Sequence, residues 1–195
     1  GVSSAAPLIF NSPLTPRTEK TFLSLNQNVA KRPLIKGTFI QTRKVQGLEK
    51  KFITRGNFLF VQEKGVYWNV TSPFKATYVF TDTGTLRIMD GVRTVIDMNE
   101  KPYYAHISNM IKTLKSGDLQ QLNQFFTVFF KGVRTNSSVG LAAKEDMMKK
   151  AVADMVISGD IYIRSLTMRD EQNNSTVILF NNLTTLKKLA PKEKK

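Results

Sequence analysis

The sequence contains no cysteine and only one histidine, His106. The missing cysteines exclude disulfides, thiolate metal ligands, cysteine nucleophiles and a lipid attached through an N-terminal cysteine within this sequence. His106 has no second histidine or acidic cluster near it in sequence to complete a metal site, so we expect it to cap or pack. The sequence therefore predicts no metal and no cofactor.

Catalytic signatures are also missing. The chain has no glycine-rich phosphate loop, no nucleophile elbow and no HExxH-type zinc motif. Its adjacent acids, at 145–146 and 170–171, fall in expected turns or helix edges, where solvated charge is usual. Paired carboxylates that catalyse acid–base chemistry need proximity in space rather than in sequence. We expect a protein that is not an enzyme.

Long apolar runs are absent. No window of about 18 uninterrupted apolar residues occurs, so no helix is expected to span a bilayer. The chain begins at Gly1 without the charged and apolar regions of an export signal, and we expect any such signal to have been removed or never present. With 195 residues, of which 41% are hydrophobic, the chain is long enough for one domain with a substantial core.

Acidic residues are outnumbered, and the formal net charge is +14. The excess lies mostly in two segments. The tail 187–195 has five lysines against one acid. The segment 31–55 has one acid, Glu49, and the eight residues of the predicted basic surface: Lys31, Arg32, Lys36, Arg43, Lys44, Lys50, Lys51 and Arg55. The electrostatic field of these charges attracts polyanions or anionic membrane surfaces. The alternative interpretation of the charge is a solubilising surface with a frayed basic tail.

Apolar spacing divides the chain into helices and strands. Residues 1–14 lack periodicity and are expected to be a loose leader, followed by one domain over 15–186 and the basic tail 187–195. Thr15-Pro16 is typical of a helix start, and the helical spacing that follows predicts an amphipathic helix ended by Pro33. From Ile35 the period becomes that of a strand, with glycine or proline at the breaks, which predicts an antiparallel meander. Its six segments are 35–45, 50–62, 65–70, 75–82, 85–91 and 92–98.

A second helical stripe follows the meander. Ile107, Met110, Ile111 and Leu114 have helical spacing on an otherwise polar segment. Residues 118–133 begin as a helix and end as a phenylalanine-rich strand, and further strands are expected within 154–170 and 175–183. The total is about ten strands and three helices. Because strands and helices do not alternate, the pattern favours an α+β fold over a parallel doubly wound sheet.

The hairpin of residues 56–73 is apolar on both faces, and so both faces must be covered. An incomplete, half-open antiparallel barrel meets this need if helices cover its concave face around a hydrophobic cavity. We expect the helix with the apolar stripe of Ile107, Met110, Ile111 and Leu114 to be a lid, since methionine suits a surface that repacks. The alternative is a dry, filled core. The predicted cavity-lining residues are Phe58, Phe60, Val66, Trp68, Val70, Tyr78 and Phe80.

An ordered set of short motifs runs along the chain: GTFIQTR at 37–43, GNFLF at 56–60, YWNVTSP at 67–73, FTDTGTL at 80–86 and ISGDIYIRSLTMRD at 157–170. In this order they resemble the LolA-like family of periplasmic outer-membrane lipoprotein carriers, from about residue 22 to residue 180. The resemblance implies a half-open barrel closed by helices around a cavity for acyl chains. It also implies a non-enzymatic periplasmic carrier, loaded by an inner-membrane transporter and unloaded by an outer-membrane acceptor.

Two positions depart from the family pattern. Where the best-studied carriers have an arginine that latches the lid, six residues before the tryptophan, this chain has Gln62, whose bond to the lid would lack charge assistance. Where the family has an aromatic after TDTGT, this chain has Leu86, Arg87 and Ile88. These departures indicate a divergent member, whose cargo is a lipoprotein or another fatty-acid-derived lipid.

The alternative function is a β-rich module that binds nucleic acid or another polyanion through its basic surface. Stacking bases and steering phosphates needs aromatic and basic residues together. Here the aromatics lie in apolar strands, whereas the basic residues lie largely upstream and in the tail. We therefore expect lipid rather than nucleic acid as the partner.

Overall fold

The computed structural model describes residues 7–30, 34–62, 64–97, 99–100, 104, 108, 119–133 and 135–186, with the side chains of 25–30 and 121 excepted. Several predicted residues lie outside this part of the chain: His106, the four residues of the lid stripe, Lys31, Arg32 and the tail 187–195. Every helix described is too short or too polar to traverse a lipid bilayer.

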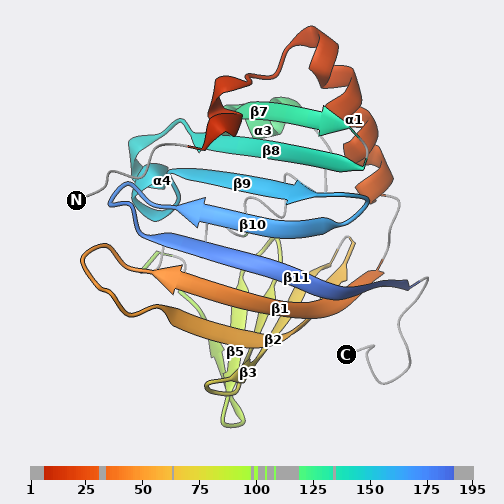
Figure 1. Cartoon of the computed structure of the whole chain (residues 1–195). Coiled ribbons are helices and arrows are strands. Elements are labelled where there is room, and N and C mark those ends of the chain that lie inside the picture. The colour runs from red at the N-terminus through yellow and green to blue at the C-terminus, as the bar shows by residue number, and fades with distance from the viewer. Residues whose placement is uncertain are drawn as a thin grey trace.

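One antiparallel sheet of eleven strands forms the body of the described structure (Figure 1). The first six strands are β1 (Leu34–Lys44), β2 (Phe52–Val61), β3 (Gly65–Ser72), β4 (Ala76–Phe80), β5 (Thr85–Met89) and β6 (Val92–Val95). The other five are β7 (Phe126–Val133), β8 (Asn136–Ala143), β9 (Asp154–Gly159), β10 (Ile163–Arg169) and β11 (Ser175–Leu186). The helices whose bounds fall within the described residues are η1 (Leu8–Asn11), α1 (Pro16–Ala30), α3 (Leu119–Phe125) and α4 (Asp146–Ala151).

The strand order is β6-β5-β4-β3-β2-β1-β11-β10-β9-β8-β7, so two meanders meet where β1 pairs with β11. β6 and β7 form the two edges and do not pair with each other, which leaves the barrel open. The predicted α+β fold with an incomplete antiparallel barrel is therefore confirmed. The sequence predicted about ten strands because β8, with the sequence NSSVGLAA, lacks large apolar residues at alternate positions.

The sheet curls, and β3 and β5 lie behind β1 and β2 in Figure 1. The enclosed face, here called the concave face, carries two clusters of buried side chains. One cluster lies on β7–β10 and includes Phe126, Val128 and Met155, against which α1, α3 and α4 pack. The other lies on β1–β4, β10 and β11 and is centred on Phe39 and Phe58. Helices thus cover one half of the concave face in the described structure.

The start of α1 agrees with the sequence. The Thr18 amide donates to Thr15 Oγ1 at 3.2 Å, and the Thr15 amide donates to Thr18 Oγ1 at 2.8 Å. This reciprocal cap satisfies amides that the first turn leaves without helical partners. The helix then buries Phe22 against Phe130, with ring centroids 5.7 Å apart.

Residues 7–14 differ from the expected loose leader. Ile9 is buried, and the Phe10 ring meets Phe129 of β7 edge-on at 5.1 Å. The Leu14 amide donates to the Val128 carbonyl, and the Phe130 amide donates to the Ser12 carbonyl. The segment therefore satisfies backbone groups that the edge strand β7 would otherwise expose. Because the segment is short, it has no apolar periodicity from which this role could have been predicted.

Candidate functional site

The predicted cavity-lining residues share one face of β2, β3 and β4. Phe58 lies opposite Trp68, which lies opposite Tyr78, and the same register continues one pair further along the strands. Because side chains alternate across a strand, residues two apart point to the same side. The register aligns all seven residues in three rows: Gly56–Val70–Ala76, Phe58–Trp68–Tyr78 and Phe60–Val66–Phe80.

The centre of this face is an aromatic stack. The Trp68 ring lies flat on Phe39, with centroids 3.7 Å apart and planes at 17°, and Phe180 meets Trp68 edge-on at 6.2 Å. Phe39 is only 1% exposed. Sequence reasoning named Phe39 as part of a motif but missed Phe180 as a site residue. The alternation in β11 points to Phe180, but its neighbours follow only from the pairing of β11 with β1.

Burial divides the seven residues into two groups. Phe58 and Val70 are buried in the cluster around Phe39 and belong to its core. The other five keep part of their surface exposed: Phe60, Val66, Trp68, Tyr78 and Phe80. Phe60 and Val66 also pack against neither of the two buried clusters of the described residues. The concave face thus has a packed centre and an apolar margin with surface left for a ligand.

Gly56 allows β2, β3 and the aromatic stack to approach closely. A Cβ at this position would overlap the Asn69 carbonyl oxygen and lie 2.8 Å from Phe39 Cζ. The register with β3 also shifts directly beside this glycine, between Arg55 and Gly56. Glycine within a strand often marks such a close approach.

Polar residues border the aromatic rows at the strand β5, which pairs with β4. Arg87 lies opposite Tyr78, and Thr85 lies opposite Phe80, so both belong to the concave face. The ring of Tyr104 stacks near Phe80, with centroids 6.4 Å apart. Burial, and next the neighbouring Tyr78, raise the pKa of Tyr104 above its ordinary value, while the Arg87 guanidinium acts in the opposite direction. Sequence reasoning noted Arg87 only as a departure from the family pattern.

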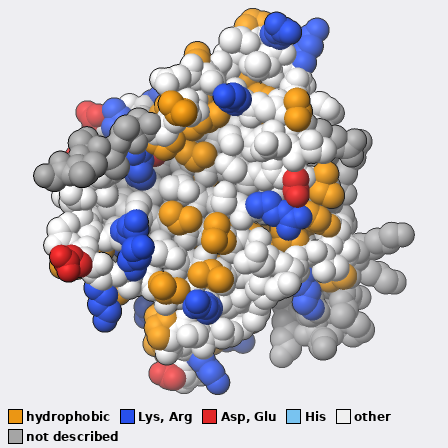
Figure 2. Space-filling model, in the orientation of Figure 1, with side chains coloured by type: hydrophobic (Ala, Val, Ile, Leu, Met, Phe, Trp, Pro, Cys, Tyr) orange, Lys and Arg blue, Asp and Glu red, His pale blue; other side chains and the backbone are white. Residues whose placement is uncertain are grey.

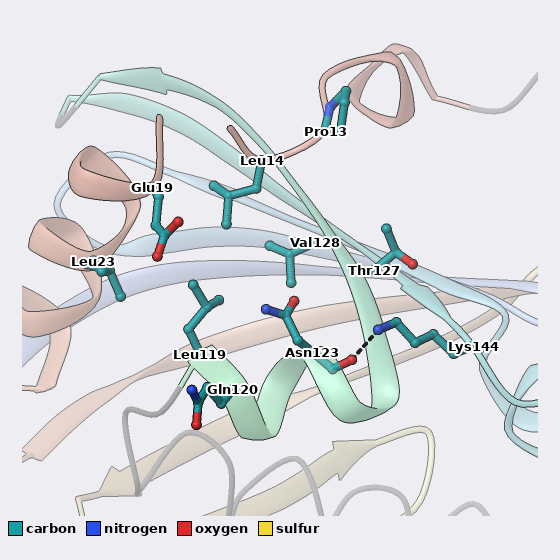
Figure 3. A pocket seen from close by; sticks show the side chains of 10 residues that line it. All are labelled: Pro13, Leu14, Glu19, Leu23, Leu119, Gln120, Asn123, Thr127, Val128 and Lys144. Atoms are coloured by element: carbon teal, nitrogen blue, oxygen red, sulfur yellow. Dashed lines mark hydrogen bonds between the residues drawn. The ribbon is translucent and has the colours of Figure 1, made fainter. Parts of the chain in front are cut away.

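A hollow lies away from the aromatic rows, at the other end of the concave face, between α1, α3 and β7 (Figure 3). Its volume is about 650 Å³. Leu23, Leu119 and Val128 point into it, and the Lys144 ammonium at its rim donates to the Asn123 carbonyl. This pocket could not be predicted from local sequence patterns, because it depends on how α1 and α3 lie across β7.

Comparison with known proteins decides the family. Residues 31–193 match the sequence model of the family described as outer membrane lipoprotein carrier protein LolA. The chain belongs to the LolA family. The match covers most of the chain, and it includes the aromatic face, Gly56 and the polar border. No curated protein matches the sequence.

Solved structures similar to this LolA family member are distant in sequence. A LolA superfamily protein from Nitrosomonas europaea is 8% identical, with 88% of this chain and 96% of that chain covered and a TM-score of 0.49. A putative outer membrane lipoprotein-sorting protein domain from Vibrio parahaemolyticus is 9% identical, with 90% and 96% covered and a TM-score of 0.45. A DUF1329 family protein from Desulfovibrio piger is 8% identical, with 91% and 96% covered and a TM-score of 0.47.

The basic residues of this LolA family member lie in two places. Lys44, Lys50 and Lys51 are exposed at or near the turn between β1 and β2, here called the basic hairpin, and Arg43 beside them donates to Thr176 Oγ1 at 3.2 Å. Lys36 and Arg55 lie on the convex face, since each alternates with concave residues of its strand. Figure 2 shows Lys and Arg side chains scattered among apolar ones on the face viewed in Figure 1.

The predicted latch residue, Gln62, directly follows β2 and is half-buried. The helix that it would hold lies outside the described residues, so the latch stays a prediction.

Proposed function

We propose that this LolA family member is a periplasmic carrier, without enzymatic activity, that binds acyl chains of lipoproteins or related lipids and shuttles them from the inner to the outer membrane. One observation carries the proposal: an open sheet aligns aromatic and aliphatic residues on one face and leaves five of them partly exposed. Exposed apolar surface of this kind marks interaction sites for apolar ligands or partners.

The energetics of acyl binding determine how cargo is passed on. Burial of a methylene stabilises by about 0.8 kcal/mol, so full burial of a 16-carbon chain approaches roughly 12 kcal/mol. A chain held so firmly leaves for water too slowly to be useful. Cargo therefore passes directly between apolar sites, from an inner-membrane transporter to the carrier and from the carrier to an outer-membrane acceptor.

The basic hairpin supports a transient contact with an anionic membrane surface. Each lysine near such a surface contributes about 1 kcal/mol of attraction, which salt screens within a Debye length. Lys44, Lys50 and Lys51 are all exposed, and none of them forms an ion pair with a described residue. They would steer the carrier towards the bilayer from which a chain is taken.

A lipid-binding assay tests the proposal. The purified protein is extracted with organic solvent, the extract is examined for lipid, and a fluorescent fatty-acyl probe is titrated into the delipidated protein. We expect saturable binding, and extraction of the probe from anionic vesicles that becomes several-fold slower between low and high salt. Absence of both lipid and saturable binding would contradict the proposal. A shift of single-stranded RNA in a gel at physiological salt, without acyl binding, would favour the polyanion-binding alternative.

A further inference from the structure

The concave face carries one feature that acyl binding alone does not require, a guanidinium group in line with the aromatic rings. Arg87 lies opposite Tyr78, which lies opposite Trp68, which lies opposite Phe58. This row crosses four neighbouring strands, a distance of about 14 Å at the usual strand spacing. Arg87 is partly buried. An elongated apolar ligand lying along the row would therefore have one end at a positive charge.

Arg87 has no carboxylate partner in the described structure. None of the ion pairs between described residues includes it. A charge that is partly removed from water is costly unless it is paired. Binding of an apolar acyl chain does not itself call for a cation here. An anion that arrives with the ligand would supply the missing partner.

A second polar group faces the same way without a partner. Thr85 is two residues before Arg87 in β5 and so shares its face, and it is only 3% exposed. Its Oγ1 is buried and has no hydrogen-bond partner in the described structure. Buried hydroxyls are normally hydrogen-bonded, and each exception calls for an explanation. Thr85 and Arg87 together offer hydrogen-bond donors to an oxyanion at the border of an apolar surface.

We propose that the cargo of this carrier is an anionic acyl lipid, whose carboxylate or phosphate is bound by Arg87 while its chain lies along the exposed parts of Tyr78 and Trp68. The proposal rests on the proposed carrier function and narrows its cargo. Guanidinium binds carboxylate and phosphate through paired, charge-assisted hydrogen bonds, which are roughly twice as strong as neutral ones. A neutral acyl group gains nothing comparable from Arg87, so the site selects by charge.

Three 16-carbon ligands test the selection: palmitate, hexadecyl phosphate and hexadecanol. Each displaces a neutral fluorescent acyl probe from delipidated wild-type protein and from the variant Arg87→Met. We expect the variant to bind palmitate, hexadecyl phosphate or both about tenfold more weakly or worse, and hexadecanol within about twofold of wild type. The anion whose affinity falls more in the variant is the one that the site prefers. Arg87→Lys, which keeps the charge, should recover part of the loss.

Arg93→Met is the matched control. Arg93 lies on the neighbouring strand β6, opposite Ile88, and therefore on the other face of the sheet, and it is exposed. This variant should bind all three ligands as wild type does. A loss of affinity for hexadecanol as large as the losses for both anions in Arg87→Met, or no loss of affinity for either anion, would overturn the proposal and leave acyl binding intact. Failure of all three ligands to displace the probe from wild type would overturn the carrier function as well.

Discussion

Replacement of Phe60 by glutamate is expected to weaken acyl-chain binding about a hundredfold without unfolding the protein. Phe60 lies on the concave face, opposite Val66, is half-buried, and packs against neither buried cluster of the described residues. A carboxylate there would lose its water when a chain arrives, at a cost of a few kcal/mol, and about 2.7 kcal/mol corresponds to a hundredfold in affinity. Titration with a fluorescent acyl probe measures the effect.

Tyr67→Glu is the control for this result. Tyr67 lies one residue before Trp68 on β3, on the convex face, and is 46% exposed. The Tyr67→Glu variant should bind the probe with the same affinity as the wild-type protein. If the Phe60→Glu and wild-type proteins bind the probe equally well, or if both variants lose the same affinity, the concave margin is not part of the binding site.

A methyl group at Gly56 is expected to destabilise the fold by about 3 kcal/mol or more, at the upper end of the cost of overpacking. The new Cβ would overlap the Asn69 carbonyl oxygen of β3 and lie 2.8 Å from Phe39 Cζ. Neither neighbour yields easily, because one is backbone in a strand and the other is a ring that is 1% exposed. The free energy of unfolding of Gly56→Ala, from denaturant titration, measures the cost.

Gly84→Ala provides the comparison. A Cβ at Gly84, between β4 and β5, would meet no atom within 4 Å. Its free energy of unfolding should stay within about 0.5 kcal/mol of wild type, as is usual for surface changes. If Gly56→Ala is equally harmless, the aromatic stack is looser than the structure indicates, and the account of this glycine is wrong.

Much of the first meander could be predicted because its signals are local. Alternating apolar residues between glycine or proline breaks predict β1 to β6, and the period of two then places Phe58, Phe60, Trp68 and Tyr78 on one face. The strand β8 was missed, since its small and polar residues leave no alternation to detect.

The rest of the site depends on long-range pairing. Phe180 reaches Trp68 only because β11 returns beside β1, after the chain has crossed to the far edge and back. No local sequence pattern predicts the pairing of β11 with β1. Arg87 is a similar case, since the sequence shows a basic residue in a strand, whereas the register shows that it ends an aromatic row. The pocket beside Leu23 and Val128 arises from the placement of two helices.

The central claim, that an acyl chain lies on the aromatic concave face, is tested most directly by the fluorescence of Trp68. This is the only tryptophan of the chain, and it is half-buried on that face against Phe39. Delipidated protein is titrated with palmitate brominated along its chain, since bromine quenches only at close range, while a short brominated acid controls for collisions in solution. The account predicts saturable quenching by the long chain alone. A brominated chain that binds, displacing a fluorescent acyl probe, yet leaves Trp68 unquenched would contradict it and place the chain elsewhere.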